Sequence, residues 1–171
     1  MYYMGKIFKV NGKFKILPFI GLTILPLIGG VGIGYLIRNS INIYGKLDKP
    51  IFSPPSFVFI VVWTILYLLM GFASYRIYMI RDSGKDIGTS LFFYIIQLLL
   101  NYLWPVIFFS FRLYGMAFIE LIVLFIFVVI TFIKFIKLDK IAGFLFIPYM
   151  AWLIFAAVLN YFVWWKNEMY I

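Results

Sequence analysis

Long apolar runs, separated by short charged segments, dominate the pattern of the chain. A helix needs about 20 mostly apolar residues to cross the hydrocarbon core of a bilayer, and five runs reach this length. Four of them carry no charge, and the fourth in chain order contains a single acid, Glu120. The runs lack the alternation of barrel strands, so helices are expected. The pattern therefore predicts an all-α polytopic membrane protein, one domain over residues 1–171, with five transmembrane helices at about 16–37, 56–80, 87–109, 113–134 and 141–165.

The composition supports a membrane protein and removes several kinds of chemistry. Hydrophobic residues make up 65% of the chain and charged residues 12%, with a mean hydropathy of +1.07, whereas a soluble domain is about half apolar and a quarter charged. Cysteine and histidine are absent, which excludes disulfides, histidine-based zinc sites and Ser-His or Cys-His catalysis. Neither a metal site nor a required cofactor is predicted. The net charge of +9 lies between the runs, which indicates a membrane surface and not nucleic acid as its partner.

The lysines and arginines between the runs predict the orientation. Ten lie on the side of the N-terminus and five on the opposite side. Because positive residues concentrate in cytoplasmic loops, the N-terminus is expected in the cytoplasm and the C-terminus outside. The ten are Lys6, Lys9, Lys13, Lys15, Arg76, Arg81, Lys85, Lys134, Lys137 and Lys140, and the five are Arg38, Lys46, Lys49, Arg112 and Lys166.

Segment 39–55 is the longest connection between two runs. Pro50, Pro54 and Pro55 make it stiff and irregular. A connection of this length is often a functional lid, and the alternative is a plain connector. Its length alone does not decide between the two.

Aromatic residues, 23% of the chain, form a candidate site inside the second and fifth runs. Trp63 and Tyr67 are four residues apart and share a helix face, and Trp152 is followed at the same interval by Ala156 and Asn160. A large ring beside a small residue leaves a space that suits a flat apolar ligand. The alternative is that these tryptophans only pack the bundle.

Polar residues inside the runs add to the candidate site. Gln97 and Asn101 lie one turn apart in the third run, and Asn160 lies in the fifth. Buried polar side chains face the bundle interior or a cavity, where they hydrogen-bond either another helix or a ligand. Glu120 could mark an ion path, pair with a neighbouring helix or lie near the membrane interface. Its place about eight residues from Arg112 favours the interface.

Three blocks of sequence resemble the TspO/MBR family of translocator proteins and tryptophan-rich sensory proteins. The first block reads YGKLDKP from Tyr44 and continues through SPPSFV from Ser53 to VWTILY from Val62. The second reads QLLLNYLWP from Gln97. The third reads PYMAW from Pro148 and LNY from Leu159. The blocks stand in the family's order and spacing, and the resemblance covers roughly residues 44–167.

The resemblance implies a bundle of five membrane helices, usually dimeric, that binds porphyrins and, in animals, cholesterol and drug-like ligands. It implies a pocket roofed by the first loop. Phe52 and Phe57 stand where tryptophan is common in the family, and the residues before about Ile16 have no counterpart. The Ile-, Phe- and Lys-rich composition favours a bacterial plasma membrane. Carried over by position, the pocket residues are Tyr44, Trp63, Tyr67, Asn101, Trp104, Trp152, Ala156 and Asn160.

The first hypothesis for the function is a membrane receptor or carrier of tetrapyrroles such as protoporphyrin IX or haem. These would be ligands held in the bilayer by a homodimer, and not required cofactors. Aromatic faces would stack on the macrocycle and Asn101 would bond a polar edge. Lys46 and Lys49 could meet the propionates.

Two further hypotheses belong to other classes. Some bacterial members of the family are reported to degrade protoporphyrin in light, so the chain could be an enzyme. Trp63 and Trp152 are then the redox-active candidates, and no other catalytic residue is predicted. The third hypothesis is a small ion-coupled transporter that relies on Glu120.

Overall fold

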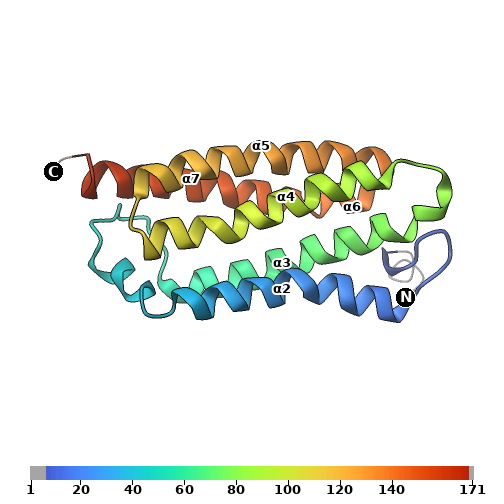
Figure 1. Cartoon of the computed structure of the whole chain (residues 1–171), viewed down its shortest axis with the longest axis horizontal. Helices are drawn as coiled ribbons and strands as arrows, with labels where there is room; N and C mark the ends of the chain where they lie inside the picture. The colour runs from blue at the N-terminus through green and yellow to red at the C-terminus, as the bar shows by residue number, and fades with distance from the viewer. Residues whose placement is uncertain (1–6, 170–171) are drawn as a thin grey trace.

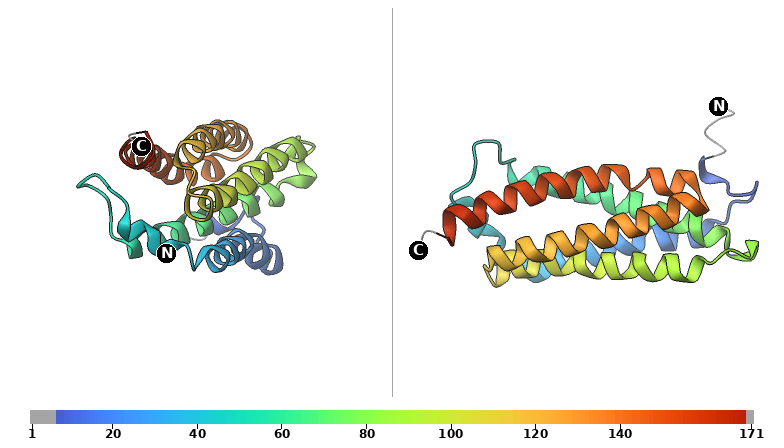
Figure 2. Two further views of the ribbon diagram at one scale, coloured as in Figure 1. Left: turned by 60° about the vertical axis from the view of Figure 1, so that its left-hand side comes forward. Right: turned by 90° about the horizontal axis from the view of Figure 1, so that it is seen from above.

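The computed structural model describes residues 7–169 and consists of long helices that run side by side (Figures 1 and 2). Five helical segments are long and apolar enough to cross a membrane, and no element within the described residues is a strand. The prediction of an all-α bundle of five membrane helices is confirmed. Lys6, one of the residues used for the orientation, lies outside the described range. The elements are α2 (Ile16–Ile37), α3 (Ser56–Met79), α4 (Ile87–Pro105), α5 (Tyr114–Leu138), α6 (Lys140–Phe144) and α7 (Ile147–Asn167).

Local chemistry sets several helix ends. Helix α3 begins at Ser56, directly after two prolines that cannot donate a backbone hydrogen bond. The side chain of Asp86 caps α4 by accepting a hydrogen bond from the Thr89 amide at 3.0 Å. Asp139 caps α6 in the same way, from the Ala142 amide at 2.7 Å. Both are the short acidic residues that favour N-cap positions.

Prolines interrupt two of the five spans. The fifth, expected as one helix over 141–165, is divided into α6 and α7 by residues 145–146. The break lies just before Pro148, which has no amide hydrogen and fits only the first turn of α7. The third span contains Pro105 at the end of α4 and continues as a π-helical turn, Val106–Ser110.

The helices form two layers. Helix α2 packs along α3, while α4, α5 and α7 form the second layer (Figure 1). A Cβ atom at Gly71 of α3 would lie 2.4 Å from the carbonyl oxygen of Thr23 on α2, so the two backbones approach this closely because glycine stands there. Within α2 the buried residues are Pro26 and Ile37. Most of its surface is therefore available to lipid.

The main buried core contains residues of both layers, and its aromatic part in the second layer lies toward the end of the bundle where α4 begins. Tyr94 of α4 stacks on Phe135 of α5 with ring centroids 5.8 Å apart, and Phe146 packs edge-on against Phe135 at 5.3 Å. At the opposite end the layers are separated by a cavity. Segment 39–55 connects α2 to α3 at this opposite end, near the last turns of α7 (Figure 1).

Candidate ligand site

A cavity of about 440 Å³ lies between the layers at the end of the bundle that carries segment 39–55. Its volume is within the range of about 300–1,000 Å³ that is usual for small-molecule sites. Helices α2, α3 and α4 form its walls, and the 3₁₀ helix Ile41–Lys46 covers part of it. Two tyrosines and two tryptophans are part of its lining: Tyr44, Trp63, Tyr67 and Trp104.

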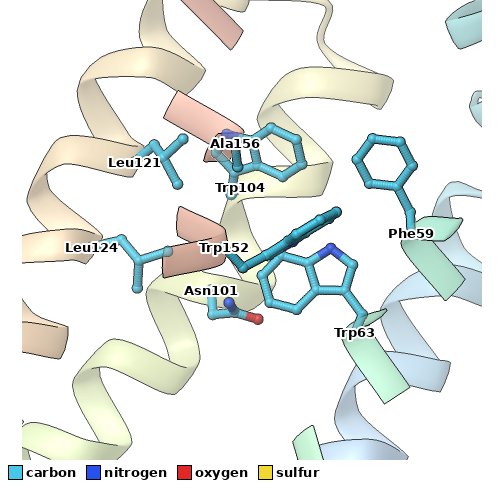
Figure 3. Close-up of a pocket in the computed structure, with 8 residues that line it drawn as sticks. All are labelled: Phe59, Trp63, Asn101, Trp104, Leu121, Leu124, Trp152 and Ala156. Atoms are coloured by element: carbon cyan, nitrogen blue, oxygen red, sulfur yellow. The ribbon is translucent and has the colours of Figure 1, made fainter. Parts of the chain in front are cut away.

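A second and much smaller cavity, about 10 Å³, shares part of this lining (Figure 3). Its volume is about enough for one water molecule. It extends the site toward α5 and α7, where Leu121, Leu124, Trp152 and Ala156 line it. The residues that line both cavities are Phe59, Trp63, Asn101 and Trp104. The two cavities are therefore adjoining parts of one aromatic site.

Seven of the eight residues carried over from the resemblance line these cavities. Tyr44 and Tyr67 line the larger, Trp152 and Ala156 the smaller, and Trp63, Asn101 and Trp104 both. Asn160 lines neither cavity. Its Oδ1 accepts a hydrogen bond from Trp104 Nε1 at 3.0 Å, and its Nδ2 donates to the Tyr114 carbonyl at 2.9 Å. Asn160 thus orients the Trp104 ring from behind.

Asn101 joins three helices at the floor of the site. Its Oδ1 accepts a hydrogen bond from the Tyr67 hydroxyl of α3 at 2.7 Å, and its Nδ2 donates to the Tyr149 hydroxyl of α7 at 2.9 Å. Of the two alternatives for the buried asparagines, contact between helices is therefore observed for both Asn101 and Asn160. An amide group has two N–H donors and two acceptor positions, so Asn101 keeps one of each for a ligand.

Trp152 offers the second polar group of the site. Its Nε1 is buried and has no hydrogen-bond partner within residues 7–169. The indole ring packs edge-on against Phe59, with centroids 5.8 Å apart, and Figure 3 shows it beside the Trp63 indole. Because a buried N–H without a partner costs free energy, a ligand acceptor placed here would relieve that cost.

Among the lining residues that were missed from the sequence, Phe59 and Gly30 are informative. Phe59 lies four residues before Trp63 on the same helix face, a spacing that could have identified it. Gly30 of α2 lines the larger cavity, and a Cβ atom there would lie 2.2 Å from Cε2 of Tyr67. The small-xxx-small spacing of Gly30 and Gly34 permits a close helix contact, but it does not identify α3 as the partner helix.

Segment 39–55 is held by hydrogen bonds within itself and is tied to α7 through Asn167. The Tyr44 hydroxyl donates to the Pro54 carbonyl at 3.3 Å, and burial raises the pKa of this phenol. The Asp48 backbone exchanges two hydrogen bonds with the Asn167 side chain of α7, at 3.0 and 2.9 Å. Lys49 donates to the Tyr44 carbonyl at 2.6 Å. Neither Lys49 nor the exposed Lys46 lines a cavity, so neither is placed to meet an acidic ligand group in this conformation.

The two remaining polar candidates lie outside the cavities. Gln97 is fully buried, and its Nε2 lies 3.9 Å from the Met70 sulfur. Glu120 is only 9% exposed, and its carboxylate oxygens have no hydrogen-bond partner in the described part of the chain. The pairing with a neighbouring helix is therefore not seen, and the position near the membrane interface stays a prediction. Glu120 is buried one residue before Leu121, which lines the smaller cavity.

Comparison with known proteins gives the family of the chain. The profile described as the TspO/MBR family matches residues 22–166. The translocator protein of Ovis aries is 35% identical over 153 residues, which cover 88% of this chain and 90% of the relative. The tryptophan-rich sensory protein of Cereibacter sphaeroides is 39% identical over 118 residues, 69% of this chain and 72% of the relative. The chain is an integral multi-pass membrane protein that belongs to the TspO/MBR family.

Proposed function

We propose that the protein is a membrane receptor or carrier of tetrapyrroles, such as protoporphyrin IX or haem, which bind between the two helix layers. The observation that carries this proposal is the cavity of about 440 Å³ with its aromatic lining. Rings from Trp63, Tyr67 and Trp104 supply flat faces for stacking. The few polar groups of the site, above all Asn101 and Trp152, suit a large apolar ligand with a polar edge.

The same geometry supports segment 39–55 as the lid of the site. Residues Tyr44 and Gly45 of this segment line the larger cavity, so a ligand that enters from this end must displace them. The attachments that would break are hydrogen bonds, including the exposed pair between Asp48 and Asn167. Exchange of the Lys49 hydrogen bond from the Tyr44 carbonyl to a propionate would place this cation on the ligand.

The binding test introduces a larger side chain into the larger cavity, at a glycine of α2. A Cβ atom at Gly34 would meet no atom within 4 Å, and Gly34 lines the larger cavity, whereas Gly32 has the same free space around a Cβ but lines no cavity. Gly34→Leu should weaken quenching of tryptophan fluorescence by protoporphyrin IX about tenfold or more, because the leucine occupies ligand volume. Gly32→Leu, the matched control, should stay within about threefold of wild type. Equal affinities in the two variants would place the ligand elsewhere.

A second substitution tests the smaller cavity. Ala156→Phe fills the space beside Trp152. The control Ala157→Phe adds the same side chain one position later, where it enters an apolar groove between α5 and α7. Ala156→Phe should lower porphyrin affinity, and Ala157→Phe should not. Unchanged affinity with Ala156→Phe in a folded protein would show that the ligand does not reach α7.

The alternative of a porphyrin-degrading enzyme is favoured by one observation, the presence of Trp63 and Trp152 on the same small cavity. Trp63→Phe and Trp152→Phe keep an aromatic face, so binding should weaken by at most about 1.5 kcal/mol. Phenylalanine is much harder to oxidise than tryptophan. If the protein degrades protoporphyrin in light, at least one variant should bind the porphyrin and form no product. A wild-type protein that forms no product in light would remove the enzyme hypothesis.

A further inference from the structure

Residues 7–15, before the part of the chain that matches the family, form a tight hairpin turn against the end of the bundle (Figure 1). The backbones of Val10 and Lys13 exchange two hydrogen bonds, each 3.0 Å long. Between them Asn11 and Gly12 have φ angles of 52° and 75°, the left-handed values that Asn-Gly adopts in a two-residue type I′ turn. We call residues 7–15 the N-terminal hairpin.

The N-terminal hairpin is fastened to α3, and through Arg76 of α3 it is linked to Asp139 before α6. Arg76 of α3 donates a hydrogen bond to the Ile7 carbonyl and forms a bidentate ion pair with Asp139, at 2.7 and 2.8 Å. Arg76 is only 4% exposed. The Lys15 amide donates to the Tyr75 hydroxyl at 3.2 Å. These contacts hold the N-terminal hairpin in one position relative to the membrane helices.

The outer side of the N-terminal hairpin is basic and aromatic. The side chains of Lys9, Lys13 and Lys15 are exposed, and none of them takes part in the ion pairs formed within residues 7–169. Phe8 and Phe14 are 41% and 43% exposed beside them, while their rings also pack on Phe19, Phe72 and Tyr75 of the membrane helices. Alternating cations and half-exposed aromatics are typical of a segment that lies in the headgroup region of a bilayer.

The whole end of the bundle around the N-terminal hairpin is positive. The described residues at this end include nine basic and three acidic side chains, a net charge of +6, against five basic and two acidic at the other end. Asp139 and Asp82 already pair with arginines, and Asp86 caps α4. The hairpin lysines are therefore left to act on what lies outside the protein, which at this depth is lipid headgroups.

We propose that the N-terminal hairpin binds the headgroups of anionic phospholipids, with Lys9, Lys13 and Lys15 at the phosphates and Phe8 and Phe14 at the acyl-chain boundary. The occupant is the leaflet that surrounds this end of the bundle. Because Arg76 and Tyr75 fasten the hairpin to α3, the bound lipid also fixes the end of the helix that carries Trp63 and Tyr67. This inference does not depend on the ligand of the aromatic site.

The test is native mass spectrometry of the full-length protein in a neutral detergent, titrated with phosphatidylglycerol or phosphatidylcholine. Wild type should bind phosphatidylglycerol more tightly, and less so as salt rises. Lys9→Gln/Lys13→Gln should weaken binding of phosphatidylglycerol about tenfold to thirtyfold. The matched control Lys46→Gln/Lys166→Gln, which removes two exposed lysines at the other end, should stay within about threefold.

Several results would overturn the proposal. Equal weakening in the two double variants would show that only net charge matters, and equal affinity for the two lipids would exclude headgroup recognition. Displacement of phosphatidylglycerol by soluble polyglutamate at the same charge concentration would favour an acidic protein partner. Lys9→Arg/Lys13→Arg keeps both charges and should retain wild-type affinity. A loss of affinity in this variant also contradicts the proposal.

Discussion

A single methyl group at Gly30 should disturb the site from the side of α2. In Gly30→Ala the new Cβ atom would lie 2.2 Å from Cε2 of Tyr67 and 2.8 Å from its Cδ2, whereas carbon atoms are in comfortable contact at about 3.5–4.0 Å. The Tyr67 ring must therefore retreat by more than about 1 Å. Trp63 and Tyr102 pack on this ring, with centroids 5.5 and 5.8 Å away, so its movement is opposed.

The retreat also breaks a hydrogen bond of the site. The Tyr67 hydroxyl lies 2.7 Å from Asn101 Oδ1, and a displacement of about 1 Å takes this distance beyond the usual limit of about 3.2 Å. Overpacking of this kind costs about 1–3 kcal/mol, of which helix propensity returns up to about 1 kcal/mol. Gly30→Ala should therefore lower the free energy of unfolding by up to about 2 kcal/mol and weaken porphyrin binding by disordering Tyr67.

The measurement is denaturant unfolding in detergent followed by circular dichroism, together with a protoporphyrin quenching titration. The control is Gly32→Ala, where a Cβ atom meets nothing within 4 Å, so stability should be unchanged or higher by up to about 1 kcal/mol. If Gly30→Ala and Gly32→Ala behave alike in both assays, the close approach of α2 to Tyr67 is refuted.

Three further predictions concern packing, pH and orientation. Gly71→Ala should lower the free energy of unfolding by about 1–3 kcal/mol, because its Cβ would meet the Thr23 carbonyl of α2. The control Gly21→Ala, with open space around the new Cβ, should not lower it. Equal stability of the two variants would contradict the close contact between α2 and α3. Burial raises the pKa of Asp139, but hydrogen bonds from Arg76 and the Ala142 amide, with the Arg76 charge, outweigh it and hold the pKa below its usual 3.8. The stability that Asp139 supplies is therefore present at neutral pH and lost as the pH falls through this lowered pKa. Asp139→Asn should lower the free energy of unfolding by about 3–5 kcal/mol at pH 7. Unfolding curves measured at a series of pH values should show this difference shrink below about pH 4. A phosphatase fused after Ile171 should be active outside the cytoplasm, as the ten-to-five distribution of positive residues predicts, and activity of a cytoplasmic reporter at the same position would reverse the orientation.

The fold could be predicted because each membrane helix carries its own signal in a continuous apolar run. The contact between Trp63 and Tyr67 could be predicted for a similar reason, since both lie on one helix and spacing alone puts their rings together, 5.5 Å apart. The kink before Pro148 was also readable in principle, because a proline always removes one helical hydrogen bond.

Relations between helices could not be predicted from the sequence. Ala156 and Asn160 lie one turn apart on α7, yet Ala156 lines a cavity and Asn160 bonds Trp104. The spacing that puts them on one face does not say where that face leaves the cavity and meets α4. Lys49, which could meet a propionate, donates instead to the Tyr44 carbonyl in this conformation, a contact within the loop that spacing does not report.

The hydrogen bonds between Asp48 and Asn167 have a consequence for the time course of ligand exchange. They fasten the mouth of the larger cavity to the last turn of α7 through contacts exposed to water, each of which contributes only about 1 kcal/mol. This end can therefore open by local fluctuation while the rest of the bundle stays folded. The residence time and the entry rate of the ligand would then depend on the hydrogen bonds between Asp48 and Asn167, which do not contact the ligand. Loosening it at Asn167 should speed arrival and departure together and leave the equilibrium affinity nearly constant.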